Sequence, residues 1–238
     1  MENASRKRYA VVTGSNKGIG FGTVKELASN GIVVVLTARD EKRGLEAVEK
    51  LAEAGLSQLV IFHQLDVTDP SSISALADFV KTKFGKLDIL INNAGVPAGK
   101  LNPEAFKAAQ IEKFIPGEWV KGVLSDVENL TEDKIDQMLN EFTKDYKEDS
   151  LESKGWPTSF SSYIVSKACL NAYTRIMAKK YPNFCINCVS PGYVKTDINC
   201  NAGVLTVEEG AQSVVSLALL PNAGPNGLFF NRHEVIPF

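Results

Sequence analysis

The chain has 238 residues, of which 44% are hydrophobic and 23% charged, a composition typical of a globular protein with one sizeable core. Its formal net charge of −2 gives no electrostatic reason to expect nucleic acid or an anionic membrane as a partner. No apolar run approaches the ~18 residues of a membrane span and no secretory segment follows the basic N-terminus, so we expect a cytoplasmic protein.

Short β-branched runs alternate with helical patterns over roughly the first ninety residues. One helix is marked by Asp69 and Pro70 at its start and by apolar residues at helical spacing from Ile73 to Phe84. The runs lack clean polar alternation, as expected of parallel strands covered on both faces. This alternation predicts βαβ units and a parallel sheet. The predicted strands are Tyr9–Thr13, Ile32–Thr37, Leu59–Leu65 and Leu87–Asn92.

A glycine-rich loop follows the first predicted strand and opens the first helix. It reads Thr13-Gly14-Ser15-Asn16-Lys17-Gly18-Ile19-Gly20. A dinucleotide pyrophosphate binds helix-end N–H groups at this place in a βαβ unit, and glycine lets the backbone approach closely. The spacing differs from the G-x-G-x-x-G of many dehydrogenases. We predict a nucleotide site here; a tight βα turn is the alternative.

The end of the second predicted strand selects between cofactors. An NAD site normally carries an acidic residue there, whereas the 2′-phosphate of NADP needs cations. The strand ends in Leu36-Thr37-Ala38-Arg39, with Asp40 one place later. Arg39 can fork onto a phosphate, and Lys17 can approach it from the glycine loop. NADP(H) is therefore favoured; the alternative, which Asp40 leaves open, is that Arg39 is an ordinary surface residue.

The middle of the chain, roughly 96–160, departs from this alternation. One helix is predicted, with Thr131 as N-cap, acidic residues in its first turn and an apolar stripe from Ile135 to Tyr146. From Glu118 to Lys154 there are 11 acidic and 5 basic residues. We interpret about 118–155 as a helical insert that is either a solvated face or a lid over a substrate cleft. Before it, the pattern is interrupted at Pro97, Gly99, Pro103, Pro116 and Gly117.

A helix predicted around Tyr163–Tyr181 carries the pattern with the most chemistry. Tyr163 and Lys167 are about one helical turn apart, so they are neighbours on one face. A cation beside a phenol favours the phenolate and lowers a pKa that is ordinarily ~10. The tyrosine can then exchange a proton with a substrate oxygen. Such a pair alone occurs by chance on many exposed helices, and the glycine loop in the same chain is what makes it informative.

The remaining elements complete the alternation, with a strand at Phe184–Ser190, a helix near Val207–Leu220 and a last strand near Leu228–Phe230. The cysteines are too few for a disulfide framework. Cys185 and Cys188 have metal-site spacing, but three residues apart on a strand they point to opposite faces. We predict a buried structural role rather than a metal or redox role. The four cysteines are Cys169, Cys185, Cys188 and Cys200.

Five motifs stand in order along the chain. They are Thr13-Gly14-x-x-x-Gly18-x-Gly20, Leu65-Asp66-Val67, Asn92-Asn93-Ala94-Gly95, Tyr163-x-x-x-Lys167 and Pro191-Gly192-Tyr193-Val194-Lys195-Thr196-Asp197. In this order they resemble the short-chain dehydrogenase/reductase family, which implies a Rossmann-like, doubly wound parallel sheet. Within it, Gly31–Arg43, the insert around Lys121–Asp133 and Leu205–Gly210 resemble plant carbonyl reductases of the salutaridine reductase and neomenthol dehydrogenase type. The resemblance covers roughly 8–96 and 116–238.

The resemblance implies roles for individual residues. Tyr163 would be the proton donor, and Lys167 would bind the nicotinamide ribose and lower the tyrosine pKa. The insert would pack beside the cleft, as in monomeric members, so a monomer is favoured. The other implied cofactor positions are Asp66 and Val67 for the adenine pocket, Asn93 and Gly95 at the end of the fourth strand, and Val194 and Thr196 for the nicotinamide carboxamide.

The family pattern is interrupted between Gly95 and Pro116. Relatives have a helix with a relay Asn there, then a central strand ending in a catalytic Ser, which need more than the roughly twenty residues present. We interpret this as an internal deletion that removes one central strand of the usual seven. The fourth strand would then have an open edge, or the strand at Phe184–Ser190 would shift to pair with it. Among the other serines, we expect Ser159–Ser162 to cap the following helix. The alternative is that Ser161 or Ser162 replaces the missing Ser as a hydrogen-bond donor to the substrate. Ser125 follows no strand that would direct its side chain toward a substrate carbonyl.

The sequence predicts a single reductase domain over 1–238. It would transfer hydride from NADPH to a small carbonyl compound, a terpenoid-like ketone or aldehyde, with Tyr163 as proton donor. The alternatives are a splice or deletion form that is impaired and at most binds NADPH, and a chain that folds poorly. No metal is expected, and the implied setting is plant secondary metabolism.

Overall fold

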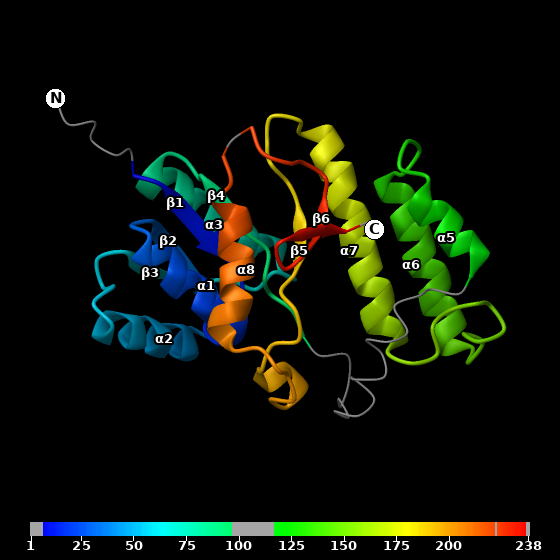
Figure 1. Cartoon of the computed structure of the whole chain (residues 1–238), viewed down its shortest axis with the longest axis horizontal. Helices are drawn as coiled ribbons and strands as arrows, with labels where there is room; N and C mark the ends of the chain where they lie inside the picture. Colours follow the sequence, from blue (N-terminus) through cyan, green and yellow to red (C-terminus); the bar gives the residue numbers. More distant parts are fainter. Residues whose placement is uncertain (1–6, 97–116, 222, 237–238) are drawn as a thin grey trace. The chain divides into compact units, whose positions relative to one another are not determined.

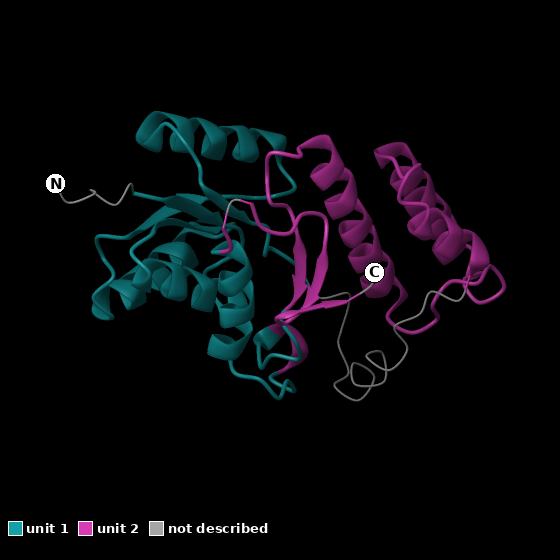
Figure 2. Cartoon of the chain, turned by 45° about the horizontal axis from the view of Figure 1, so that its top comes forward, with its two compact units in different colours: residues 1–96, 191–197, 201–219 teal, residues 97–190, 198–200, 220–238 magenta. Residues whose placement is uncertain are grey.

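The computed structural model describes residues 7–96, 117–221 and 223–236. The chain divides into two compact units, which Figure 2 shows in different colours. Unit 1 comprises 1–96, 191–197 and 201–219, and unit 2 comprises 97–190, 198–200 and 220–238. The predicted interruptions from Pro97 to Pro116 lie outside the described residues. No helix in the described ranges is long and apolar enough to cross a lipid bilayer.

Unit 1 is built on a four-stranded parallel sheet (Figure 1). Every strand lies within one or two residues of its predicted position, which confirms the parallel α/β fold. The strands are β1 (Tyr9–Val12), β2 (Val33–Ala38), β3 (Val60–Gln64) and β4 (Ile89–Ile91), in the order β3-β2-β1-β4. The helices of this unit are α1 (Gly18–Ser29), α2 (Glu41–Glu53), α3 (Pro70–Phe84) and, from the second half of the chain, α8 (Val207–Ala218).

The two faces of this sheet bury alternate residues, as the two-residue period of a strand requires. Val12 and Val34 belong to a core cluster that also contains residues of α1, α2 and α8. Their neighbours Val11 and Val35 belong to a second cluster, which includes Leu76 of α3. Helices therefore cover both faces, which explains why the predicted strands show no polar alternation. The layering is visible in unit 1 of Figure 2.

The predicted helix starts are confirmed by their capping bonds. The Asp69 carboxylate accepts a hydrogen bond from Ser71 N at 2.9 Å, immediately before Pro70 at the start of α3. The hydroxyl of Thr131 accepts one from Lys134 N at 3.3 Å. Each bond satisfies an N–H group that the first turn of a helix leaves without an intrahelical partner.

Where the structure describes unit 2, it combines three helices with a small sheet. Its helices are α5 (Glu118–Ser125), α6 (Glu132–Lys147) and α7 (Ser161–Lys180). Its strands are β5 (Cys188–Ser190), β6 (Phe229–Asn231) and β7 (Glu234–Ile236); β5 and β6 are parallel, and β6 and β7 antiparallel. A short 3₁₀ turn, η1 (Asp197–Asn199), follows β5. The prediction contained neither α5 nor β7.

The insert packs on α7 through an apolar core. Ile135, Met138 and Phe142 of α6 belong to one buried cluster with Val165 and Cys169 of α7. The three residues of α6 share the helical spacing that predicted the stripe, and the two of α7 are one helical turn apart, so these apolar residues of the insert are covered rather than solvated.

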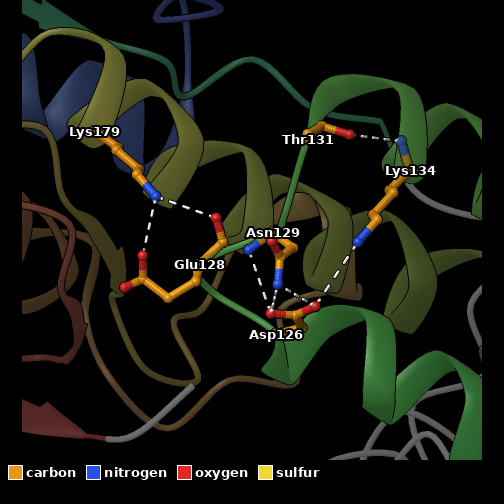
Figure 3. Close-up of polar contacts among 6 residues, drawn as sticks. All are labelled: Asp126, Glu128, Asn129, Thr131, Lys134 and Lys179. Atoms are coloured by element: carbon orange, nitrogen blue, oxygen red, sulfur yellow. Dashed lines mark hydrogen bonds and ion pairs between the residues drawn. The ribbon is translucent and has the colours of Figure 1, made fainter.

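Polar contacts also fasten the connection between α5 and α6 to α7 (Figure 3). Lys179 Nζ donates to Glu128 O at 3.1 Å and pairs with Glu128 Oε2 at 3.3 Å. Within the connection, Asp126 accepts from Asn129 Nδ2 at 3.0 Å and pairs with Lys134 Nζ at 3.8 Å. These contacts involve exposed groups, so each adds little stability, but together they define where the connection lies.

β5 is shorter than the strand predicted at Phe184–Ser190 because side chains take the place of a neighbouring strand. Ile186 N donates to Asn226 Oδ1 at 2.8 Å, and Asn187 Nδ2 donates to Pro225 O at 2.7 Å. Within the described residues, β5 pairs with β6 and β4 pairs with β1. The alternative in which the later strand shifts to pair with the fourth is therefore not adopted.

Candidate active site

The glycine loop lies directly against the end of β4. Gly14 has φ +59°, and a Cβ there would stand 2.8 Å from Ala94 Cα. A Cβ at Gly20 would overlap Asn93 Nδ2. Both positions thus require glycine, one for its backbone conformation and one for space. The loop is a close-fitting cradle at the N-terminus of α1, the place where a pyrophosphate binds backbone N–H groups.

Thr13 and Asn93 join the loop to the end of β4. Asn93 Nδ2 donates to Thr13 O at 2.9 Å and to Gly14 O at 3.0 Å. In return, Thr13 Oγ1 accepts from the backbone N–H groups of Asn93 and Ala94, both at 2.9 Å. The predicted residue Asn93 therefore shapes the loop, and Gly95 follows it at the same edge of the sheet. Sequence reasoning assigned no role to Thr13, although a hydroxyl before the first glycine was a readable signal.

Asp66 and Val67 follow β3 at the same end of the parallel strands. Asp66 Oδ1 accepts from Thr68 N at 2.9 Å and from Thr68 Oγ1 at 2.7 Å. These two hydrogen bonds, with a further contribution from the charge of Arg39, lower the pKa of Asp66. The Asp66 carboxylate is therefore ionised and held in place beside the predicted adenine position.

A pocket of about 370 Å³ opens between the glycine loop and α2. Three cationic and two anionic side chains line the pocket, so the net charge of its lining is positive. Arg39, the predicted phosphate ligand, is not among the lining residues, whereas Lys17 is. Arg43 and Lys50 were missed, although their spacing of seven places them on one face of a helix. The lining residues are Asn16, Lys17, Arg43, Glu46, Ala47, Lys50 and Asp197.

The loop 191–197 is anchored to the rest of unit 1. Val194 is buried and forms a β-bridge with Leu205, and Lys195 N donates to Leu205 O at 2.8 Å. Thr196 Cγ2 lies 3.4 Å from the position of a Cβ on Gly18. The structure therefore brings the predicted carboxamide residue Thr196 to the glycine loop, whereas Val194 contacts Leu205 and Gly210.

Tyr163 and Lys167 lie together in unit 2, on a partly exposed face of α7 where 39% of Tyr163 is exposed. Lys167 Nζ is 5.8 Å from the centroid of the Tyr163 ring, within range of a cation–π interaction. Burial raises the pKa of the Tyr163 phenol and lowers that of the Lys167 ammonium. The direction at Tyr163 is opposite to the expectation from the cation alone, because desolvation of the phenolate dominates.

The serines before Tyr163 do not cap α7 as predicted. The N-cap is Phe160, in the left-handed conformation with φ 51°, and no side chain caps it. The helix begins at Ser161, which places Ser161 and Ser162 inside its first turn, where Ser161 is buried. The start of α7 therefore depends on its surroundings rather than on a local cap.

The exposure of each cysteine depends on its place in the fold and not on the C-x-x-C motif. Cys185 is exposed and Cys188 half-buried, and all four are free thiols. The buried role predicted for the C-x-x-C pair is wrong for Cys185, which is exposed because residues 185–187 form a loop and not a strand, and Cys188 is only half-buried.

Parallel strands with a glycine cradle after the first of them define a dinucleotide-binding α/β protein. Residues 8–141 match the family described as short chain dehydrogenase. The (+)-neomenthol dehydrogenase of Capsicum annuum is 45% identical over 312 aligned positions, covering 100% of this chain and 99% of the relative. Carbonyl reductase (NADPH) 1 of Rattus norvegicus is 35% identical over 99% of this chain and 100% of the relative.

A solved structure agrees with these matches. Salutaridine reductase from Papaver somniferum superposes with a TM-score of 0.87 at 41% identity, covering 94% of this chain and 99% of that one. The chain belongs to the short-chain dehydrogenase family and is an oxidoreductase with its Rossmann-like fold. The predicted family and fold class are thereby confirmed.

Proposed function

We propose that the chain reduces a small carbonyl compound with NADPH, with Tyr163 as proton donor. The observation that carries the proposal is the pairing of Tyr163 and Lys167 on one face of α7, in a chain that also has the glycine cradle. The two units would act as one reductase domain, with the insert at about 118–155 beside the cleft.

NADP(H) fits the residues present. Glycine at positions 14 and 20 lets the loop pack against Ala94 and Asn93, and a glycine loop at this place lets a pyrophosphate approach the backbone. The pocket beside it presents Lys17, Arg43 and Lys50, the kind of cation cluster that a 2′-phosphate requires. Arg39 would contribute from the end of β2. The name of the rat relative, which specifies NADPH, supports the same choice.

Each group of residues would have one task. NADPH, when bound, supplies a hydride to the carbonyl carbon. Tyr163 would donate its hydroxyl proton to the carbonyl oxygen; a phenol of ordinary pKa ~10 carries that proton at neutral pH. Lys167 would hold the nicotinamide ribose. Val194 backbone groups and the Thr196 hydroxyl would orient the carboxamide, while Asp66 and Val67 would border the adenine.

The names of the relatives suggest the substrate class. Neomenthol dehydrogenase acts by name on a terpenoid alcohol, and salutaridine reductase by name on an alkaloid. We propose a terpenoid-like or alkaloid-like ketone or aldehyde, reduced by a cytoplasmic monomer in plant secondary metabolism.

We also propose that the family's catalytic Ser and relay Asn are missing from this chain. The alignment with the Capsicum annuum protein runs over 312 positions, whereas the chain has 238 residues, so gaps must stand opposite this chain. Loss of one preorganised oxyanion donor costs about 100- to 1,000-fold in rate. We therefore expect turnover slower by about that factor than that of the Capsicum annuum relative assayed beside it.

The test follows NADPH oxidation with a panel of terpenoid ketones and aldehydes, for the chain and for Tyr163→Phe. We expect Tyr163→Phe to lose about 100- to 10,000-fold in kcat with NADPH affinity unchanged. Tyr173→Phe is the matched control, because Tyr173 lies on the same helix with similar exposure, 41% against 39% for Tyr163. Saturable NADPH binding without any turnover would instead establish the impaired form, and absence of NADPH binding would overturn the cofactor assignment.

A further inference from the structure

Two of the residues that line the pocket beside the glycine loop form an ion pair. Lys17 Nζ lies 2.9 Å from Asp197 Oδ2, with 61% and 66% of the two side chains exposed. Lys17 precedes Gly18 in the glycine loop, and Asp197 ends the loop 191–197. The two partners are 180 residues apart in the sequence. The pair therefore joins the two loops to which the proposed function assigns the phosphate end and the nicotinamide end of the cofactor.

Asp197 is held in position by the chain around it. Asn201 N donates to Thr196 O at 2.9 Å, and Leu205 and Val204 N–H groups donate to Tyr193 O at 3.0 and 2.8 Å. A Cβ on Gly210 would come within 2.5 Å of Val194 Cγ2, so α8 packs tightly on the same loop. The carboxylate is thus presented to Lys17 by an anchored segment rather than by a free tail.

The ammonium group of Lys17 cannot pair equally well with the Asp197 carboxylate and with a phosphate at the same time. A phosphate monoester carries a charge of about −1.5 to −2 at neutral pH, whereas a carboxylate carries −1. A 2′-phosphate that entered the pocket would recruit Lys17 together with Arg43 and Lys50. Asp197 would then lose its partner and stand close to the phosphate as a like charge. A nucleotide with a free 2′-hydroxyl has no 2′-phosphate to pair with Lys17, so the Lys17–Asp197 ion pair can remain.

We propose that Asp197 is a specificity-determining residue that competes with the 2′-phosphate of the cofactor for Lys17. It lowers the affinity for 2′-phosphorylated nucleotides and leaves the affinity for their 2′-hydroxyl counterparts unchanged. This rests on the proposed function, since it presupposes that an NADP-type cofactor binds to unit 1. The same competition makes phosphate binding release Asp197, the residue next to Thr196.

The test measures binding, not activity. Isothermal titration calorimetry of the full chain compares 2′,5′-ADP with 5′-AMP, which differ only in the 2′-phosphate. The difference in affinity therefore gives the contribution of the 2′-phosphate to binding. Asp197→Asn should tighten 2′,5′-ADP by about two- to five-fold, which is the range expected when an exposed ion pair is removed, and should leave 5′-AMP unchanged. The gain should shrink at high salt, where exposed charges are screened. NADPH and NADH are titrated in parallel.

Two further variants separate the competition from general electrostatics. Glu46→Gln removes the other acidic group of the same pocket without freeing Lys17, so it should tighten 2′,5′-ADP by less than Asp197→Asn does. In a Lys17→Met background, Asp197→Asn should lose most of its effect, because the contested cation is gone.

Each outcome decides a different point. Three results would overturn the competition while leaving the cofactor assignment intact. The first is that Asp197→Asn changes the affinities for 2′,5′-ADP and 5′-AMP equally, and the second is that Glu46→Gln tightens 2′,5′-ADP as much as Asp197→Asn does. The third is a gain in 2′,5′-ADP affinity from Asp197→Asn that persists without Lys17. Weaker 2′,5′-ADP binding by Asp197→Asn would show that Asp197 supports the site instead. If the unmutated chain binds neither NADPH nor 2′,5′-ADP, the cofactor assignment itself is wrong, and the competition is wrong with it.

Discussion

Tyr163 shows how burial can outweigh a neighbouring charge at the scale of one residue. Lys167 Nζ lies 5.8 Å from the ring centroid, yet the pKa of the phenol is raised because partial burial of the side chain, which is 39% exposed, disfavours the phenolate. The pKa of Lys167 is lowered by the same cause. A phenol is protonated at neutral pH already at its ordinary pKa of ~10, and the protonated form is the one that donates a proton in a reduction.

The thiols provide a test of burial that does not depend on activity. Burial raises the pKa of Cys169 and of Cys188 to about 11, from an ordinary value of 9.0, and outweighs the opposing charge of Arg175 at Cys188. A rise of this size reduces the thiolate fraction at pH 8 by about 100-fold. We expect iodoacetamide at pH 8 to modify the exposed Cys185 and Cys200 first.

Peptide mass spectrometry over time measures these rates site by site. The rate at Cys188 should rise about tenfold for each pH unit up to the raised pKa. In urea all four thiols should react alike, which serves as the control. Modification of Cys188 in the folded chain as fast as Cys185 would contradict the structure.

At the scale of elements, a buried hydrogen bond joins α6 to the segment that precedes α7. Trp156 Nε1 donates to Asp145 Oδ2 at 2.8 Å, and the two residues are 2% and 5% exposed. Trp156 also packs edge-on against Phe142, with ring centroids 5.2 Å apart. Asp145 lies on α6 and Trp156 on the segment that leads into α7. The bond therefore fixes that segment to the insert just before Tyr163.

Removal of the acceptor should destabilise this junction. Asp145→Leu leaves the buried indole N–H without a partner, which costs about 1–3 kcal/mol of unfolding free energy. Asp145→Asn keeps a carbonyl oxygen in reach and should cost less. Urea unfolding followed by tryptophan fluorescence measures both. Asp136→Leu is the same change on the exposed face of α6, and it should alter the unfolding free energy by no more than about 0.5 kcal/mol. Equal losses of unfolding free energy at the two sites would show that the buried hydrogen bond does not stabilise the junction.

At the scale of the whole molecule, the two units have separate cores. The clusters around Val34 and around Val35 belong to unit 1, and the cluster around Met138 belongs to unit 2. The glycine cradle and the cation pocket also lie entirely in unit 1. A nucleotide that binds there stabilises the state that it recognises, by ~2.7 kcal/mol at one hundred times its dissociation constant.

We therefore expect 2′,5′-ADP to slow amide hydrogen exchange in peptides of unit 1 more than in α7. Hydrogen-exchange mass spectrometry with and without the ligand measures this difference, and 5′-AMP is the matched weaker ligand. Equal protection of β1 and α7 would show that the units open together, in which case binding to one stabilises both.

Prediction from the sequence succeeded where neighbouring residues specify the structure. The strands of unit 1, the caps at Asp69 and Thr131 and the apolar stripe of α6 were all predictable, because each depends on residues within a few positions of one another. α5 was missed because it is only 8 residues long, and β7 because it pairs antiparallel with β6, outside the βαβ alternation that predicted the other strands. Such short elements form only when other parts of the fold support them.

The sequence by itself determined the parallel sheet of unit 1, the place of the glycine loop and the one-turn spacing of Tyr163 and Lys167. Local periodicity and turn chemistry encode these features. Only the tertiary structure decided that Lys17 and Asp197 form an ion pair, that Arg43 and Lys50 share their pocket, and that burial controls the pKa of Tyr163. These depend on contacts and desolvation between residues far apart in the chain, which no local pattern records.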